Sequence, residues 1–412
     1  LTAIYHRPES EYAYLYKEDQ LHIRIRTKKD DVQRVILHYG DPFIFIEDKY
    51  ESQKEMTKVT SDALFDYWQV TVSVHFARIQ YLFELLDKEG QGVYYGDKGC
   101  VEYTQENLDA EGNGFKLPYI HEIDGCQVPS WVSNTVWYQI FPERFANGNP
   151  KLTPDGAREW DAELAPNRDD FFGGDLQGII DHLDYLKDLG ITGLYLCPIF
   201  EATTNHKYDT TDYFEIDRHF GDKEVFANLV EEAHKRGIKI MLDAVFNHIG
   251  YQSAQWQDVL KNGENSPYKD WFHIQEFPVT EDKLQNPRQL PYHTFAFASY
   301  MPKLNTANPE VKAYLLSVAT YWIENFDIDA WRLDVANEID HQFWRDFRKA
   351  VLSKKPDLYI LGEIWHTSQP WLQGDEFHAV MNYPLSESIK DYFLRQHKKT
   401  GQFISEINSQ SM

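Results

Sequence analysis

The sequence predicts two domains of different class, an all-β domain followed by a parallel α/β domain. Early segments alternate polar and apolar residues, later segments alternate helical patterns with apolar strands, and the change falls near residue 131. At 412 residues, the chain is also too long for one ordinary domain. We predict a β-domain over residues 1–122, a linker over 123–130 and the α/β domain over 131–412.

The β-domain is predicted from strict alternation. The segment "LHIRIR" (Leu21–Arg26) alternates throughout, and "WQVTVSVHFARIQYLFEL" (Trp68–Leu85) alternates over a length sufficient for two strands. Glycines and prolines separate these runs. Short strands with alternating faces are typical of an antiparallel sandwich, which is the fold we expect here.

The α/β domain is predicted from repeated helix–strand units. Each helical pattern ends before an apolar strand candidate, and Gly190 and Gly237 mark two of these ends. The strand candidates are Ile191–Phe200, Ile238–Phe246, Ile328–Asp334, Leu358–Trp365 and Phe377–Tyr383. Such units build a parallel sheet covered by helices, either doubly wound or closed as a (β/α)₈ barrel. No GxGxxG follows the first strand, which weakens the dinucleotide-binding option.

Residues 249–305 interrupt this rhythm. The segment is long, aromatic and polar, and it shows no clear helix–strand unit. We predict a small inserted domain between Ile238–Phe246, counted as the third strand of the barrel, and its helix, and insertions at strand ends are usually functional.

Composition excludes some partners. The formal net charge is -24 and no long basic run offsets it, which argues against nucleic-acid and anionic-membrane partners. The three cysteines, Cys100, Cys126 and Cys197, are widely spaced, which favours a reduced, cytoplasmic setting. No signal peptide or membrane span is evident in the sequence.

Polar residues gather at the carboxyl ends of the predicted strands, where the active sites of barrels lie. These residues include Asp243, Asn247, His248, Arg332, Asp334 and Glu363. Two carboxylates at one barrel mouth are the minimum needed to cleave a glycosidic bond. Arg332 should lower the pKa of Asp334, whereas apolar neighbours should raise that of Glu363. The competing interpretation is a buried structural ion pair.

Six motifs stand out along the chain: "VWYQIFPERF" (Val136–Phe145), "HKYDTTDY" (His206–Tyr213), "DAVFNH" (Asp243–His248), "MPKLN" (Met301–Asn305), "WRLDVANE" (Trp331–Glu338) and "GEIW" (Gly362–Trp365). They resemble conserved regions of the α-amylase family of glycoside hydrolases, and of its cyclomaltodextrinase, neopullulanase and maltogenic amylase group in particular. The resemblance spans almost the whole chain and implies the barrel rather than the doubly wound sheet.

The resemblance implies a role for each matching residue. Asp334 resembles the nucleophile, Glu363 the general acid and then base, and Arg332 the support of the nucleophile. His248 and Tyr208 resemble groups around the cleaved sugar, and Asp243 and Asn247 resemble structural members of that shell. The leaving-group side is implied to include Glu338, Trp365 and Tyr383.

The implied function is retaining hydrolysis of α-1,4-glucosidic bonds in cyclomaltodextrins, pullulan and malto-oligosaccharides, with transglycosylation. A homodimer is implied, in which the N-terminal domain covers the partner's cleft. Two alternatives stay open: a non-catalytic glucan-binding or scaffold protein with an amylase-like shell, and an enzyme that is mainly a glucanotransferase.

The sequence departs from the family pattern at its end. The family supplies a third carboxylate from a later strand, and no such strand follows Tyr383. We therefore expect a C-terminally incomplete barrel, in which either the chain is a fragment or a second chain completes it, with full activity needing that part.

A structural calcium ion is implied at an oxygen-rich loop, while no organic cofactor is expected. The implied ligands are Asn147, Asn149, the Gly173 carbonyl and Asp175. Leu152 and Thr153 stand where relatives tend to offer polar or acidic ligands.

Overall fold

The protein forms two compact units. The computed structural model describes residues 3–17, 19–43, 50–125, 127–160, 165–279, 286 and 288–410. One unit comprises residues 1–127 with 382–412, and the other comprises residues 128–381. The predicted linker residue Cys126 lies outside the described residues.

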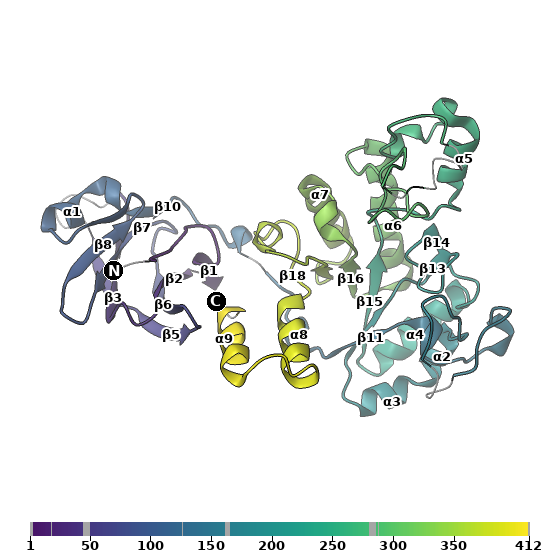
Figure 1. Ribbon diagram of the computed structural model, residues 1–412, viewed down its shortest axis with the longest axis horizontal. Coiled ribbons are helices and arrows are strands. Elements are labelled where there is room, and N and C mark those ends of the chain that lie inside the picture. Colours follow the sequence, from purple (N-terminus) through teal and green to yellow (C-terminus); the bar gives the residue numbers. More distant parts are fainter. Residues whose placement is uncertain are drawn as a thin grey trace. The chain divides into compact units, whose positions relative to one another are not determined.

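The first unit contains a sandwich of two antiparallel sheets, as the alternation predicts (Figure 1). One sheet has the strand order β1-β2-β6-β5, and the other has the order β4-β3-β7-β8-β9 with β10 pairing to β7. The strands are β1 (Ala13–Lys17), β2 (Gln20–Lys28), β3 (Arg34–Gly40), β4 (Ser52–Glu55), β5 (Thr57–Ser61), β6 (Phe65–Ser73), β7 (Ile79–Leu86), β8 (Gly92–Gly96), β9 (Gly99–Glu102) and β10 (Phe115–Leu117).

The alternation explains how this sandwich closes. Leu21, Ile23 and Ile25 of β2 are fully buried, and they share one core cluster with Val35 and Phe83 of the other sheet. Because side chains alternate between faces, each strand supplies every second residue to this core. The long alternating run does form two strands, β6 and β7.

Two C-terminal helices, α8 (Tyr383–Ile389) and α9 (Thr400–Gln410), also belong to the first unit. The Asn408 side chain donates a 2.9 Å hydrogen bond to the Ser61 carbonyl, and the Ala63 N–H donates a 2.7 Å bond to Ser405 Oγ. The sequence predicts this segment as part of the barrel domain, but these contacts tie α9 to the edge strand β5. The short helix α1 (Gln105–Asp109) completes the unit.

The second unit is built on six parallel strands among the described residues, in the order β11-β12-β15-β16-β17-β18 (Figure 1). The strands are β11 (Trp137–Ile140), β12 (Gly193–Leu196), β15 (Lys239–Ala244), β16 (Ala330–Leu333), β17 (Tyr359–Gly362) and β18 (Ala379–Val380). Neighbours in sequence are neighbours in the sheet, which is barrel order and not the order of a doubly wound sheet. The sheet is thus an open part of a barrel, as expected.

Helices follow the strands in turn and pack side by side on the outer face. They are α2 (Leu176–Asp181), α3 (Leu183–Asp188), α4 (Lys223–Lys235), α6 (Pro309–Phe326) and α7 (His341–Lys354). The starts are capped as in stable helices: Asp222, Asn308 and Asp340 each accept a backbone N–H of the first turn. Among the described residues, none of the helices combines the length and apolar character that crossing a membrane requires.

Alternation along the parallel strands decides which side chains face the barrel interior. Leu194, Leu242 and Leu333 join the large core beneath the helices, whereas Tyr195 and Met241 belong to a separate interior cluster. The same alternation continues to the carboxyl ends of the strands, so the polar residues at those ends also face the barrel interior.

The predicted insertion between β15 and α6 is present as an irregular segment around helix α5 (Ala254–Asn262). Trp256 is fully buried, with its ring 4.7 Å from that of Phe272 and 4.5 Å from that of Tyr292. Isolated β-bridges hold the segment together, and the bridge between His248 and Lys303 pairs its last part with the residues that follow β15. Residues 280–285 and 287 of the insertion lie outside the described residues.

Candidate active site

The register of the sheet brings Asp243 and Arg332 together. Asp243 on β15 pairs with Arg332 on β16, so both side chains leave the same face at the same level. Arg332 Nη1 lies 2.9 and 3.0 Å from the two Asp243 carboxylate oxygens. Both residues are buried, so each charge has its partner where an isolated charge would be costly.

The same guanidinium holds both predicted catalytic carboxylates. Arg332 Nη1 donates a 2.7 Å hydrogen bond to Asp334, two residues further along the same face, and Nη2 lies 2.6 Å from Glu363 Oε1. Glu363 Oε2 accepts a 3.0 Å hydrogen bond from the N–H of Val335, which adopts a left-handed conformation with φ 45°. Asp334 and Glu363 are each 5% exposed. The structure therefore unites residues 243, 332, 334 and 363 at one mouth, as the strand-end argument predicts.

The proton balance of this cluster differs from the expectation. Burial raises the pKa of the Asp334 carboxyl, the negative charges of Asp243 and Glu363 raise it further, and Arg332 lowers it without reversing the shift. Burial also raises the pKa of Asp243 against the pull of Arg332. Desolvation opposes the charged form of Arg332, but the surrounding carboxylates raise its pKa overall. The prediction that Arg332 gives Asp334 a low pKa is thus wrong, because three carboxylates share one cation.

Two tyrosines complete the shell around Asp243. Tyr195 Oη donates a 2.6 Å hydrogen bond and Tyr208 Oη a 3.0 Å hydrogen bond to Asp243 Oδ2. Burial, then the Asp243 charge, raises the pKa of both phenols, so they remain neutral donors. The sequence predicts Tyr208 beside the cleaved sugar, and the structure places it in this cluster.

The Tyr208 loop joins the antiparallel strands β13 (Phe200–Ala202) and β14 (Thr210–Ile216). Lys207 sits before Tyr208 with φ 62°, and its ammonium lies 2.7 Å from Asp217 Oδ2. Both side chains of this pair are 1% exposed. This buried ion pair, with further hydrogen bonds to the Ala202 backbone, fixes where the loop places the Tyr208 phenol.

His248 and Asn247 form the next layer. His248 is 1% exposed, and its Nε2 lies 3.0 Å from the Tyr208 carbonyl while Nδ1 lies 3.3 Å from Asn247 Nδ2. Burial lowers the pKa of His248 to about 4, so its imidazole is neutral at pH 7. The Phe295 ring stacks on the imidazole at 5.2 Å. Both ring nitrogens therefore bond within the protein.

Lys303 links this layer to the predicted leaving-group side. Its ammonium contacts the Asn247 side-chain oxygen and lies 3.0 Å from the Glu338 carbonyl and 3.4 Å from Glu338 Oε2. Burial lowers the pKa of Lys303, and Glu338 partly restores it. Lys303 belongs to the motif "MPKLN", but the motif alone does not predict that this lysine contacts Asn247.

The remaining predicted residues are placed differently. Trp365 follows Glu363 and is 68% exposed, as a sugar-contacting ring would be. Tyr383 begins α8 in the other unit, so its role stays a prediction. Tyr195 is absent from the predicted site; the signal that could have found it is a lone polar aromatic at an interior position of an apolar strand.

The predicted calcium ligands lie in one hydrogen-bonded loop, and calcium binding there stays a prediction. Asp175 is fully buried, and its carboxylate accepts hydrogen bonds from the N–H groups of Gly148, Asn149 and Gly178, the last as the cap of α2. Asn147 Nδ2 donates to Thr153 Oγ1 at 2.7 Å. The described residues contain no group of three or more histidine, cysteine or acidic side chains that would hold a metal.

Comparison with known proteins agrees with this architecture. Residues 139–410 match the family described as alpha amylase, catalytic domain, and residues 1–121 match the alpha amylase N-terminal ig-like domain. A cyclomaltodextrinase from Geobacillus thermopakistaniensis is 56% identical over 98% of this chain and 68% of its own. An intracellular maltogenic amylase from Bacillus subtilis is 53% identical over 100% of this chain and 68% of its own.

Solved structures of relatives share the fold of this chain. A solved cyclomaltodextrinase structure superposes with a TM-score of 0.92 at 46% identity, over 99% of this chain and 68% of that one. Family, relatives and structure all match across both units. The chain belongs to the α-amylase family of glycoside hydrolases.

Proposed function

We propose that the cluster around Arg332 performs retaining hydrolysis of α-1,4-glucosidic bonds in cyclomaltodextrins, pullulan and malto-oligosaccharides. The observation that supports this most directly is that one buried guanidinium contacts both Asp334 and Glu363. A structural ion pair with Asp243 alone would already neutralise Arg332, so it does not account for the two further carboxylates. A double displacement needs two, on one barrel mouth and held in fixed relation.

In the first step, Asp334 attacks the anomeric carbon while Glu363 gives its proton to the leaving oxygen. The bond between the anomeric carbon and that oxygen breaks, and an ester to Asp334 forms. In the second step, water attacks the same carbon, Glu363 takes the water proton, and the ester bond breaks. Two inversions retain the configuration. A sugar hydroxyl in place of water gives transglycosylation with the same balance of bonds and protons.

The charge balance of the cluster supports this scheme, which requires one proton on the carboxylates. Asp243, Asp334 and Glu363 would carry three negative charges against the one positive charge of Arg332 if all were ionised. Burial makes that state costly, and the pKa of both Asp243 and Asp334 is raised accordingly. The scheme requires that, once sugar is bound, Asp334 is the anion and Glu363 carries the proton.

The anomer formed first tests the proposal. Proton NMR during early hydrolysis of maltotriose should show the α-anomer before mutarotation, because retention preserves the configuration of the cleaved bond. Asp334→Asn and Glu363→Gln should each lower kcat by at least about a thousandfold. The exposed Glu231→Gln on α4 is the matched control and should leave kcat unchanged. Sugar binding without turnover in the parent protein would contradict the proposal for this chain, and it would agree with the non-catalytic alternative or with the expected need for the part that completes the barrel.

We propose further that the protein is a cytoplasmic homodimer. Support comes from the name of a relative, an intracellular maltogenic amylase, and from the family resemblance. Light scattering coupled to size-exclusion chromatography would give the oligomeric state. Thermal unfolding with EDTA and with added calcium would test the calcium prediction.

A further inference from the structure

Histidine side chains hold both backbone polar groups of Tyr208. The Tyr208 N–H donates a 3.1 Å hydrogen bond to His206 Nδ1, and the Tyr208 carbonyl lies 3.0 Å from His248 Nε2. The phenol of the same residue donates to Asp243, the carboxylate that contacts Arg332. The place of this phenol in the catalytic cluster therefore depends on two imidazoles.

The two histidine contacts have opposite requirements for a proton. A carbonyl oxygen only accepts, so His248 presents an Nε2–H group to it, and a protonated imidazole would do the same. A backbone N–H only donates, so His206 Nδ1 must be bare to accept it. His206 therefore holds Tyr208 only as a neutral ring with its hydrogen on Nε2.

A neighbouring hydroxyl offers the protonated His206 ring a different partner. Thr204 Oγ1 lies 3.1 Å from His206 Nδ1. The same oxygen donates to the Asp209 carboxylate and accepts the Lys207 N–H at 3.2 Å. An Nδ1–H group would donate to Thr204 Oγ1 and would face the Tyr208 N–H donor to donor. Protonation of His206 thus replaces an attraction at the Tyr208 backbone by a repulsion.

The rest of this loop is anchored by groups other than His206. The Asp209 carboxylate accepts hydrogen bonds from the backbone N–H and hydroxyl groups of Thr203 and Thr204. The buried lysine–aspartate pair described above adds a second anchor. Because these contacts do not involve the imidazole, a change at His206 should displace Tyr208 while the loop as a whole stays folded.

Charged and titratable groups from three segments face the His206 ring. They are Asp209 and Lys207 of its own loop, Arg168 and Asp169 of the segment before α2, and His248 after β15. Burial lowers the pKa of His206 from its ordinary 6.5; Asp209 and Asp169 oppose this shift, and Arg168 and Lys207 add to it. The ring is therefore neutral at pH 7 and takes up its proton only as the pH falls below 6.5.

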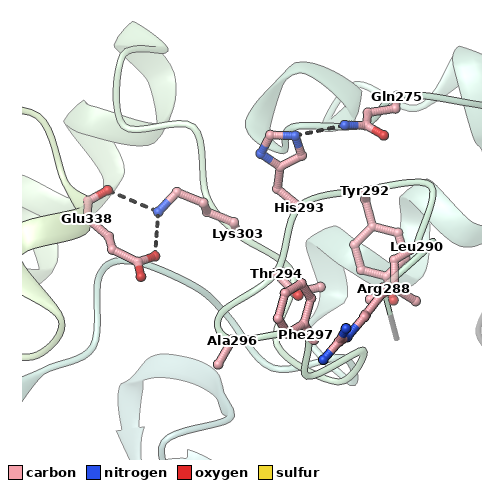
Figure 2. A pocket seen from close by; sticks show the side chains of 10 residues that line it. All are labelled: Gln275, Arg288, Leu290, Tyr292, His293, Thr294, Ala296, Phe297, Lys303 and Glu338. Atoms are coloured by element: carbon pink, nitrogen blue, oxygen red, sulfur yellow. Dashed lines mark hydrogen bonds and ion pairs between the residues drawn. The ribbon is translucent and has the colours of Figure 1, made fainter. Parts of the chain in front are cut away.

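His248 does not share this sensitivity. Burial lowers the pKa of His248 to about 4, and the nearby Lys303 ammonium, which pairs with Glu338, acts in the same direction (Figure 2). Its Nε2–H group can donate to the Tyr208 carbonyl whether or not the ring is charged. The acid sensitivity of the Tyr208 backbone contacts therefore resides in His206.

We infer that His206 is a positioning residue of the catalytic cluster, whose neutral ring holds the Tyr208 phenol against Asp243 and whose protonation releases it. The catalytic consequence rests on the proposed function, because Asp243 contacts the guanidinium that holds both proposed catalytic carboxylates. As the pH falls, the cluster should lose the Tyr208 donor in step with the protonation of His206.

NMR tests the inference without requiring turnover. ¹⁵N-histidine labelling reports which ring nitrogen carries hydrogen, and His206→Asn assigns the His206 signals by their loss. Labelling lysine carbonyls with ¹³C and tyrosine amides with ¹⁵N selects the two Lys–Tyr pairs of the sequence, and Lys49→Arg removes the pair other than 207–208. His206 should show a bare Nδ1 at pH 7. The Tyr208 amide signal should shift with the same midpoint as the His206 ring.

Kinetics on maltotriose test the catalytic consequence. His206→Phe removes the acceptor and should lower kcat/KM about tenfold at pH 7.5, since the Tyr208 N–H loses its bond. His206→Asn supplies a side-chain oxygen in the manner of an Asx-turn and does not titrate, so it should recover most of that loss.

The decisive quantity is the ratio of kcat/KM in the parent to that in His206→Asn. It should fall as the pH drops below 6.5, by up to about tenfold, because only the parent loses the bond to Tyr208. Titration of the catalytic carboxylates affects both proteins and cancels in the ratio. The matched control is His397→Asn, at an exposed histidine, for which the ratio should stay constant.

The outcomes separate this inference from the proposed function. A Tyr208 amide that does not respond to His206 protonation, or a His206 ring with its hydrogen on Nδ1 at pH 7, overturns the inference even if the protein cleaves maltotriose. A constant ratio of parent to His206→Asn between pH 5 and 7.5 overturns the catalytic role of His206. A parent without turnover contradicts the proposed function, and the NMR titration then decides whether His206 positions Tyr208.

Discussion

The phenol of Tyr195 donates a 2.6 Å hydrogen bond to Asp243, the carboxylate whose two oxygens both contact Arg332. The Arg332 guanidinium also lies 5.7 Å from the Tyr195 ring centre. Tyr195 thus contacts both members of the ion pair beneath the two proposed catalytic carboxylates. Its position determines where Arg332 can present donors to Asp334 and Glu363.

Tyr195→Phe should lower kcat about tenfold with little change in KM, because it removes a charge-assisted hydrogen bond without touching the sugar. Asp243 would then have one donor fewer, and its pKa would rise. The acid limb of the pH–rate profile should accordingly move to higher pH. Steady-state kinetics on maltotriose between pH 4 and 8 would measure both effects.

Tyr185→Phe is the matched control, since that tyrosine is exposed on α3 and the change removes the same hydroxyl. It should leave kcat and the pH profile unaltered. A Tyr195→Phe enzyme whose kcat falls without any movement of the acid limb would show that the Tyr195 hydroxyl positions Asp243 without setting its pKa.

Much of the site could be predicted because strand ends are local in sequence. Arg332 and Asp334 are two residues apart in an apolar strand, so the period of two alone places them on one face of that strand. Asp243 and Glu363 can then be placed at the same mouth, because the carboxyl ends of parallel strands meet at one edge of the sheet. Tyr195 could not be assigned to the site from the sequence, because its contact with Asp243 depends on the register between β12 and β15.

The energetic prediction failed where several charges meet. From the sequence, Arg332 is the obvious neighbour of Asp334 and should lower its pKa. The structure adds Asp243 and Glu363 to the same guanidinium and buries all four groups, so desolvation and repulsion outweigh that single attraction. The distances from Arg332 to Asp243 and Glu363 depend on the packing of three strands, so they cannot be inferred from neighbours in sequence.

The fold was predictable to a similar depth. Helix ends at Gly190 and Gly237 and strand positions follow from local patterns. The grouping of α8 and α9 with the sandwich depends on contacts such as that of Asn408 with Ser61, more than three hundred residues apart in sequence. Side chains so distant leave no local pattern to read.

Lys207→Met should destabilise the fold by about 3–5 kcal/mol, because it leaves Asp217 buried without its cation. The Tyr208 loop should loosen with it, so KM should rise as well. Urea unfolding and maltotriose kinetics would measure the two effects. Combining Lys207→Met with Asp217→Asn removes the orphaned charge and should restore part of the stability. A double variant less stable than Lys207→Met would contradict this account.

Asp329→Asn should cost about 3 kcal/mol of unfolding free energy, since Asp329 is buried among cations. Its oxygens lie 2.7 Å from His234 Nε2, 2.8 Å from Lys239 Nζ and 3.2 Å from Lys355 Nζ. Burial opposes ionisation, but these partners lower the pKa of Asp329 overall. The stabilisation that ionised Asp329 gives the fold is therefore complete at pH values above the pKa of this group in the unfolded chain. It is lost as the pH falls through the lower pKa of the folded protein. Asp327→Asn, at a 73% exposed side chain, should change stability by less than about 0.5 kcal/mol in the same urea assay.

His378 should make the fold acid-sensitive. Burial lowers the pKa of His378 from 6.5 to about 3, and its Nδ1 accepts a 3.0 Å hydrogen bond from the Ile360 N–H of β17, which requires a neutral ring. Because the folded pKa lies below the unfolded one, the contribution is complete above pH 6.5 and declines as the pH falls toward 3. At pH 5 the loss should be about 2 kcal/mol.

His378→Asn keeps an acceptor at that position but does not titrate, so the variant should lose about 2 kcal/mol less than the parent between pH 7 and pH 5. Urea unfolding at the two pH values gives this difference directly. His248 and His6, whose pKa values are each lowered to about 4, add terms of the same sign that cancel in the comparison. His397→Asn, at an exposed residue, should follow the parent. An equal loss in parent and His378→Asn would mean that His378 is not neutral in the folded protein, and the hydrogen bond to Ile360 would then need a different donor and acceptor.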